Sequence, residues 1–263
     1  MKSFYEEDGS YLRATPLTRG PWSEDAQHGG PPLALLGRAI EHAAGDGFVS
    51  RITGELLRPI PISSFTIDVE VLRSGRKARL IQATLRHEGT ACAKATGLVL
   101  LENAVYLPVG LPRPRLKAPA QCAPFDFTFF PNPVGYQSAM EMRIIQGIWG
   151  SGAAVAWLRM RVPLVLGEEP SPLQRVLVAA DAGNGVSAPL PIEDYAFINP
   201  DLTVYVHRRL RGEWVGLDGI TRVEPNGVGL AQAELHDEEG PIGRSLQGLL
   251  VGVRHDIVRS PKS

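Results

Sequence analysis

The sequence predicts an α+β protein made of two tandem repeats, each with a long central helix wrapped by a curled antiparallel sheet. Two observations support this prediction. In the first hundred residues, one amphipathic helical pattern is followed by several runs of alternating apolar and polar residues. The same order of patterns then starts again in the second half of the chain. We place the repeats at residues 1–105 and 136–263.

Composition limits the possible classes of protein. Of the 263 residues, 44% are hydrophobic, and 27 basic against 28 acidic side chains leave a net charge of −1. No long basic run is present that would follow a nucleic-acid backbone. No signal-peptide pattern and no long apolar span are present either. We therefore expect a cytoplasmic protein that binds neither nucleic acid nor a membrane. Its two cysteines, Cys92 and Cys122, suggest no metal site.

The first repeat begins with a helical pattern over residues 31–44, preceded by two glycines and followed by strand patterns. In "FTIDVEVLR", residues 65–73, apolar and polar side chains alternate, as in a half-buried strand. The runs "LIQATLR" and "TACAKATGLVLLE" lie on either side of the turn sequence "HEG". Together these patterns predict one helix followed by antiparallel hairpins.

A proline-rich segment, residues 106–135, separates the repeats, and we expect it to be a semi-rigid connector. Beyond it, "GAAVAWLRMRVPLV" has a strand pattern. A second helix is then predicted in "PSPLQRVLVAADAGNG", with Ser171 as its N-cap and Pro172 in its first turn. The order of elements therefore resembles that of the first half.

The two halves can be aligned at an offset of about 150 residues. "QATLRHEG" in the first half matches "QAELHDEEG" in the second, with one residue of difference in the turn. This alignment places Arg51 opposite Asp201 and Thr96 opposite Gln247. Two such halves can pair their edge strands into one continuous sheet, which protects both edges.

These matches carry a family resemblance. "QHGGPPLALLGRAIEHA", "ITGELLRPIPISSFTIDVEVLRSGR", "AADAGNG" and "DLTVYVHRRLRGEWVGL" resemble the two halves of a double-hotdog acyl-CoA thioesterase of the thioesterase II kind. The resemblance implies that thioesters bind where the two hotdogs meet. It also implies hydrolysis of acyl-CoA to a free acid and CoA, without a cofactor, in fatty acid metabolism. Double-hotdog protomers of this kind can form a homo-oligomer.

The resemblance implies that a carboxylate, a hydroxyl and a side-chain amide hold the hydrolytic water. Motif matching assigns these roles to Asp201, Thr221 and Gln247, with Asp201 as general base. The match at Thr221 needs a shift of one residue. Each residue also has a structural reading, as a turn residue, a strand filler and an exposed strand residue respectively. Asp181 matches another aspartate of the family, and we expect it to make a structural hydrogen bond at a helix end.

The glycines before the first helix suggest an anion site. Backbone N–H groups at a helix start are free and lie at the positive end of the helix dipole. The N–H groups of Gly29 and Gly30 could therefore stabilise the oxyanion of a thioester carbonyl. The alternative is a tight turn without a catalytic role. His28 is expected to be a turn or capping residue.

The phosphates of coenzyme A need cations. The densest basic stretch of the first half is "RSGRKAR", and we assign phosphate binding to Arg73, Arg76 and Lys77. A solvated hairpin turn is the alternative.

Two rival functions remain open. A hotdog enoyl-CoA hydratase or dehydratase would use an Asp and a His on the hotdog helix, whereas Asp201 and His207 lie in a predicted strand. A non-catalytic hotdog protein would bind acyl-CoA or an acyl-carrier protein without turnover. The sequence contains no G-x-S-x-G elbow and no dinucleotide-binding glycine pattern.

Overall fold

The computed structural model describes residues 2–107, 110, 112–126, 130–147 and 150–257. The first repeat contains two short strands, one long helix and four long strands. In chain order these are β1 (Tyr5–Asp8), β2 (Tyr11–Ala14), α1 (Gly30–Ala44), β3 (Phe48–Leu56), β4 (Ser64–Arg73), β5 (Ala78–His87) and β6 (Thr90–Leu100). A short 3-10 helix, η1 (Pro16–Thr18), lies between β2 and α1.

The second repeat has the same order of elements, with additions. Its members are β8 (Met140–Gly147), β9 (Ala153–Met160), α3 (Pro172–Ala180), α4 (Gly183–Val186), β10 (Tyr195–Ile198), β11 (Asp201–Val206), β12 (Val215–Val223), β13 (Val228–Asp237), β14 (Gly240–Val253) and α5 (Arg254–Ile257). Between the repeats lie η2 (Pro119–Gln121), β7 (Ala123–Phe125) and α2 (Tyr136–Ala139). The strand pair β1–β2 escaped the sequence analysis because each strand has only four residues, several of them charged.

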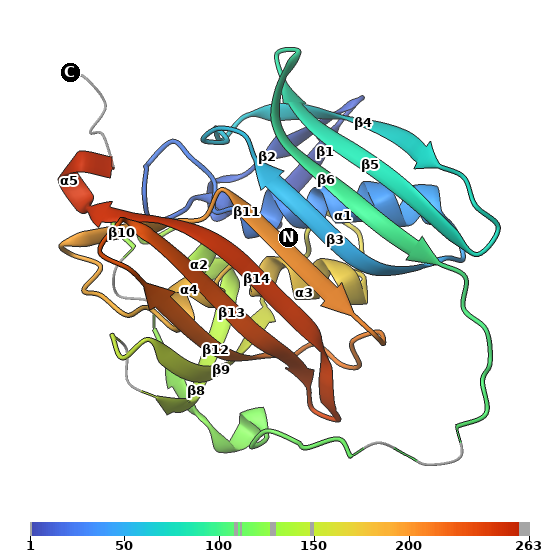
Figure 1. Cartoon of the computed structure of the whole chain (residues 1–263). Coiled ribbons are helices and arrows are strands. Elements are labelled where there is room, and N and C mark those ends of the chain that lie inside the picture. The colour runs from blue at the N-terminus through green and yellow to red at the C-terminus, as the bar shows by residue number, and fades with distance from the viewer. Residues whose placement is uncertain (1, 108–109, 111, 127–129, 148–149, 258–263) are drawn as a thin grey trace.

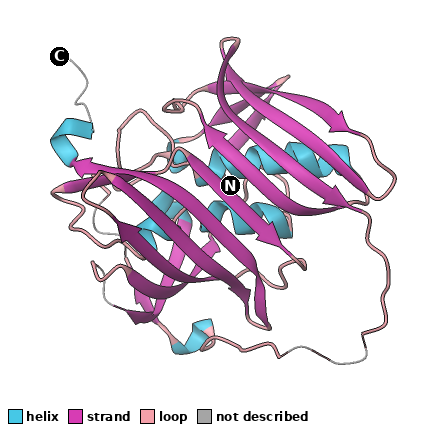
Figure 2. Ribbon diagram, in the orientation of Figure 1, coloured by secondary structure: helices cyan, strands magenta, loops and turns pink. Residues whose placement is uncertain are grey.

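All long strands belong to one antiparallel sheet in the order β1-β2-β4-β5-β6-β3-β11-β14-β13-β12-β9-β8-β7. The order is symmetric about the junction between β3 and β11. Each strand of the first repeat has a counterpart in the second repeat at the same distance from this junction. At the junction, β3 pairs with β11, so the two repeats share one continuous sheet as expected. Figure 1 shows the curled sheet in front of α1 and α3, and Figure 2 shows that helices lie on its concave side.

The register at the junction corrects the alignment of the repeats. Thr53 faces Thr203 across the pseudo-twofold axis, an offset of 150 residues. The β5–β6 and β13–β14 turns have the same length, so this offset continues into the last strands. Gln247 therefore corresponds to Gly97, and the predicted match with Thr96 was wrong. That match aligned Gly89 with Gly240, although the first glycine lies in the turn and the second begins a strand.

The central helices of the two repeats differ. α1 is a continuous helix of 15 residues with a largely buried face against the sheet. α3 has nine residues, begins after the N-cap Ser171 as predicted, and ends before Asp181. The short α4 follows after this break, so the long helix expected in the second repeat is interrupted. The break matters because it exposes the C-terminal end of α3 to a cavity.

Within the described residues, no helix is both long enough and apolar enough to cross a membrane.

Candidate active site

A break in the sheet positions one wall of the site. β10 and β11 both pair with β14, but Asn199 and Pro200 between them leave the ladder. Pro200 has no N–H to donate, which favours such a break. The carboxylate of Asp201 accepts a hydrogen bond from the Gly248 N–H at 2.8 Å and so replaces a missing ladder bond. Asn199 is thereby free to direct its side chain toward the helices.

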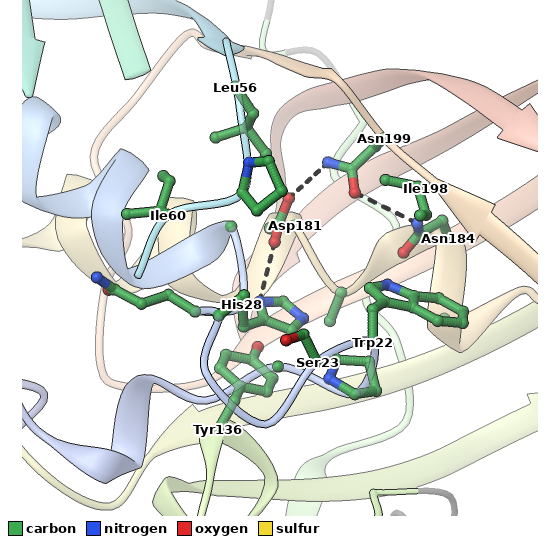
Figure 3. Close-up of a pocket in the computed structure, with 18 of the residues that line it drawn as sticks. Trp22, Ser23, His28, Leu56, Ile60, Tyr136, Asp181, Asn184, Ile198 and Asn199 are labelled. Carbon is green, nitrogen blue, oxygen red and sulfur yellow. Dashed lines mark hydrogen bonds and ion pairs between the residues drawn. The ribbon is translucent and has the colours of Figure 1, made fainter. Parts of the chain in front are cut away.

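Asp181 is the centre of the site. It follows the last residue of α3 and is only 2% exposed. Its Oδ1 accepts hydrogen bonds from Asn199 Nδ2 at 2.8 Å and from Gln247 Nε2 at 3.3 Å. Gln247 Nε2 also donates to the Asp181 carbonyl at 3.0 Å. A buried carboxylate thus holds together the end of α3, the β10–β11 break and β14. Figure 3 shows its contact with Asn199.

His28 approaches the other carboxylate oxygen. Its Nδ1 lies 2.9 Å from Asp181 Oδ2. The imidazole stacks on the ring of Tyr136, with centroids 3.8 Å apart and an angle of 4° between the planes. Tyr136 is itself fixed, because its hydroxyl donates to the Val178 carbonyl at 2.8 Å. The imidazole is therefore held both in its plane and across it (Figure 3).

The electrostatics of the site keep Asp181 ionised. Burial alone would raise the pKa of this carboxyl, because a charge is poorly solvated there. The charge of His28 and hydrogen bonds from His28, Asn199 and the Gly30 N–H act in the opposite direction. The net result is a pKa below the ordinary aspartate value. A negative charge therefore stands beside the cavity at neutral pH.

The cavity has a volume of about 550 Å³ and is bordered by both repeats. Its wall is largely apolar, and His28, Asp181 and Asn199 form a polar group on one side of it (Figure 3). The apolar wall is made by Trp22, Leu56, Ile60, Phe130, Tyr136, Ile192, Phe197 and Ile198. Arg58, an exposed residue, also borders the cavity. Such a site suits a ligand with a long apolar part and a polar reacting group.

Two of the predicted glycines lie at this site in different roles. Gly29 is the N-cap of α1 and lines the cavity. Its N–H makes no hydrogen bond to another described residue, so this group is available to a ligand. The Gly30 N–H instead points at His28 Nδ1, at 3.2 Å, and at Asp181. A Cβ at Gly30 would lie 2.7 Å from the Val178 carbonyl oxygen, so this glycine permits close helix packing.

The predicted catalytic trio is only partly assembled. Gln247 joins the cluster, but through Asp181 and not through Asp201. The Asp201 carboxylate is bound to the Gly248 N–H, and Thr221 Oγ1 lies 2.7 Å from Ser187 Oγ in a buried pair. Neither Asp201 nor Thr221 is among the described residues that line the cavity. These contacts favour structural roles for both.

The pair of residues considered for a hydratase is also separated. Asp201 begins β11 and His207 follows its end. At the rise of an extended strand, six residues span about 20 Å. Asp201 and His207 therefore do not share one site.

The basic hairpin lies far from the cavity. Arg73, Arg76 and Lys77 surround the β4–β5 turn, which is level with Phe48 at the start of β3. The cavity is at the other end of that strand, at Leu56, roughly 26 Å away at the strand rise. This placement does not support phosphate binding by the hairpin. Sequence reasoning relied on charge density, which carries no information on distance.

Asp181 makes hydrogen bonds at a helix end, as expected, and His28 lies in the turn before α1. The sequence did not predict that these two side chains meet each other and Asn199. Asn199 was not considered, although an asparagine before a proline marks a probable break in a strand. No spacing rule connects the three, because they meet only after the repeats pack together.

A smaller cavity of about 190 Å³ occupies the pseudo-equivalent position. The offset of 150 residues relates the residues lining the two cavities. Leu56, Arg58, Ile60, Phe197 and Ile198 in the larger correspond to Val206, Arg208, Leu210, Gly47 and Phe48 in the smaller. Asn199 corresponds to the apolar Val49. Glu41 near the end of α1 contacts Ser171 at the start of α3, much as Asp181 contacts the start of α1.

Metal ions have no evident place here. Among the residues that the structure describes, no group of three or more His, Cys, Asp and Glu side chains could hold one.

Comparison with solved structures shows the fold. A candidate thioesterase II from Thermobifida fusca is 17% identical, with a TM-score of 0.74 over 92% of this chain and 91% of that chain. A hot dog fold protein from Alicyclobacillus acidocaldarius is 15% identical, with a TM-score of 0.73 over 98% and 96%. An acyl-CoA thioesterase II from Mycobacterium marinum is 16% identical, with a TM-score of 0.65 over 95% and 96%. A search of curated proteins gave no match.

Comparison with family models covers most of the chain. The acyl-CoA thioesterase N-terminal domain matches residues 18–100, within the first repeat. The acyl-CoA thioesterase C-terminal domain matches residues 119–251. Both halves of the duplicated fold are thus matched, in the order that the sequence predicted, and the chain belongs to the acyl-CoA thioesterase family.

Proposed function

We propose that this thioesterase hydrolyses acyl-CoA in the larger cavity, at the cluster centred on Asp181. The observation that carries the proposal is a buried, ionised carboxylate beside an apolar cavity of about 550 Å³. Hydrolysis needs a group that polarises water next to a bound acyl chain, and this arrangement supplies both requirements. The proposal places the carboxylate of the site at Asp181 and not at Asp201.

The side chains around Asp181 fit a hydrolytic site. Asn199 and Gln247 hold the carboxylate in one orientation through amide donors. In this proposal the Gly29 N–H, at the positive end of α1, stabilises the oxyanion that forms when water attacks the carbonyl carbon; its position as N-cap in the cavity wall supports this role. Collapse of that intermediate breaks the C–S bond and releases CoA. No covalent bond between protein and substrate is needed.

Arg58 is our candidate for binding the coenzyme. It lies exposed at the cavity and forms no ion pair with another described residue. Its counterpart in the second repeat, Arg208, is paired with the buried Asp237. The first repeat has His87 at the position of Asp237, so Arg58 lacks this partner and can meet a phosphate group.

A panel of acyl-CoA thioesters of increasing chain length tests the function through release of free thiol. We expect turnover of at least one member by the wild-type protein. Asp181→Asn, which is nearly isosteric but neutral, should reduce kcat by about 10³-fold. Asp201→Asn is the matched control and should retain most of the activity, because an amide oxygen can still accept from Gly248.

Circular dichroism and thermal unfolding would confirm that both variants fold. Wild-type activity in folded Asp181→Asn would refute the assignment of Asp181. Tight binding of acyl-CoA by the wild-type protein without any thiol release would instead support the non-catalytic alternative.

A further inference from the structure

The Asp181 carboxylate has little capacity to take a proton from water. Its Oδ1 accepts from Asn199 and Gln247, and its Oδ2 faces His28 Nδ1. The Gly30 N–H adds a further donor. A carboxylate that is surrounded by donors is stabilised in its charged form, which makes it a weak base. A different group must therefore accept the proton.

The contact between His28 and Asp181 fixes the tautomer of the imidazole. The Gly30 N–H also lies 3.2 Å from Nδ1. Two acceptors, Nδ1 and Oδ2, would however repel each other at 2.9 Å, so a proton must lie between them, and the Gly30 N–H then donates to Asp181. In the neutral imidazole that proton resides on Nδ1, and Nε2 then carries a free lone pair. The carboxylate thus leaves the basic nitrogen on the opposite side of the ring.

Nε2 is accessible from the cavity. His28 is one of the residues lining it, and its side chain is 12% exposed. Within the described residues Nε2 takes part in no hydrogen bond, whereas Nδ1 lies 2.9 Å from the Asp181 carboxylate. The ring cannot easily turn, because Tyr136 stacks on its face and Asp181 holds its edge. Figure 3 shows the ring between these two residues, with Ser23 and Trp22 beside it.

We propose that His28 is the general base of the reaction and that Asp181 is its positioning residue. Nε2 takes a proton from the attacking water while the water oxygen bonds to the thioester carbonyl carbon. The imidazolium formed is stabilised by the adjacent Asp181 carboxylate. When the C–S bond breaks, Nε2–H returns the proton to the sulfur of the leaving CoA, and the imidazole is neutral again. The inference rests on the proposed function of this cavity.

His28→Asn separates this role from a purely structural one. The asparagine Nδ2 can take the place of the imidazole Nδ1 and donate to Asp181, but it offers no counterpart of Nε2. If His28 only holds Asp181 in place, His28→Asn should keep wild-type turnover. If Nε2 is the base, kcat should fall by about 10² to 10⁴-fold with little change in KM.

His28→Phe and His28→Ala complete the experiment. Phenylalanine retains the stacking on Tyr136 without either nitrogen, and should lose activity as His28→Asn does. Alanine leaves a gap beside Tyr136 that free imidazole can fill. We expect added imidazole to raise the turnover of His28→Ala at least tenfold in a saturable manner. It should have no such effect on Asp181→Asn, which retains its own imidazole.

The outcomes are distinct. Turnover of His28→Asn within about threefold of wild type would overturn the inference and leave the proposed function intact. Loss of turnover in His28→Asn without rescue of His28→Ala by imidazole would also overturn it. Absence of thiol release from every acyl-CoA by the wild-type protein would instead refute the proposed function itself.

Discussion

Asp181 shows how one buried charge can organise a site. An unpaired carboxylate at this depth would be strongly unfavourable, so its donors are essential to the native state. They come from widely separated segments: the turn before α1, the break between β10 and β11, and β14. Each donor is an ordinary residue in its own segment. Their common function exists only in the folded chain.

This explains why the sequence predicted the site incompletely. Gln247 could be predicted because the family resemblance placed it near the end of the last strands. Asp181 in "AADAGNG" was expected at a helix end, where α3 does end, but nothing local showed that this end packs against the start of α1. His28 was interpreted as a turn residue because its partner lies 153 residues away in the sequence. Local sequence patterns give information about residues that are close in the chain, whereas the residues of this cluster lie far apart in the chain.

At Arg58, replacement by alanine should raise KM for acyl-CoA by about tenfold and leave kcat nearly unchanged. The reason is loss of a charge-assisted hydrogen bond to phosphate, which contributes about 1.5–3 kcal/mol. The KM of a thioester that lacks the nucleotide should not change. Arg76→Ala in the basic hairpin is the control, and an increase in KM there instead would return phosphate binding to the hairpin.

Among the elements, the break between β10 and β11 has the largest consequence for the site. In a continuous strand the side chains would alternate between the two faces of the sheet, and Asn199 would remain in the ladder. Pro200 interrupts the pairing, and Asp201 satisfies the Gly248 N–H that is left over. The conspicuous aspartate is thus a structural residue of the break. The side chain of Asn199, two residues earlier, donates a hydrogen bond to the Asp181 carboxylate.

Periodicity predicted which segments form strands and which form helices. It did not predict where each of these elements begins and ends. The alternation in residues 65–73 predicted β4, and Ser171 with Pro172 predicted the start of α3. The end of α3 at Asp181 was expected in "AADAGNG", whereas the short α4 that follows was not predicted. The strands β1 and β2 are too short for a period to be recognised.

The end of β11 is held by an ion pair whose loss should destabilise the fold. Arg208 contacts Asp237, whose side chain is fully buried, through both guanidinium nitrogens. Arg208→Met should lower the free energy of unfolding by about 3–5 kcal/mol, because it leaves a buried carboxylate without its cation. Arg211→Met removes an exposed pair with Glu239 and should cost at most about 1 kcal/mol.

The same pair predicts a pH dependence. Burial alone would raise the pKa of Asp237, but hydrogen bonds from Arg208 and from backbone N–H groups bring it below the ordinary value. A depressed pKa means that the stabilisation is complete above the unfolded-state value of about 3.9 and is lost as the pH falls below it. Urea unfolding between pH 3 and 7 would measure this. An unchanged pH slope in Arg208→Met would contradict it.

At the scale of the whole molecule, duplication created two equivalent cavities of which one retains a complete cluster. The smaller cavity has Val49 at the position of Asn199 and Gly97 at that of Gln247. A Cβ at Gly97 would lie 2.5 Å from Ile40 of α1, so the continuous helix fills the space that Gln247 uses in the other repeat. The interrupted helix of the second repeat is therefore a condition for the larger site.

The duplication itself was the most secure result of the sequence analysis, because repeated order is a property of the whole chain. The two repeats border cavities of different volume, about 550 and 190 Å³. Arg51 does correspond to Asp201 in the register, but neither lines the larger cavity. The two repeats differ in their central helices and in the turns before these helices.

The carboxylates of Asp181 and Glu41, each of which contacts the start of the other repeat's helix, give the most direct test of the account. kcat/KM for one hydrolysed acyl-CoA should be measured for Asp181→Asn and for Glu41→Gln, both nearly isosteric and both neutral. We expect a fall of about 10³-fold in Asp181→Asn and a value within about threefold of wild type in Glu41→Gln. A severe loss in folded Glu41→Gln, with activity retained in Asp181→Asn, would contradict the account and place the reaction in the smaller cavity.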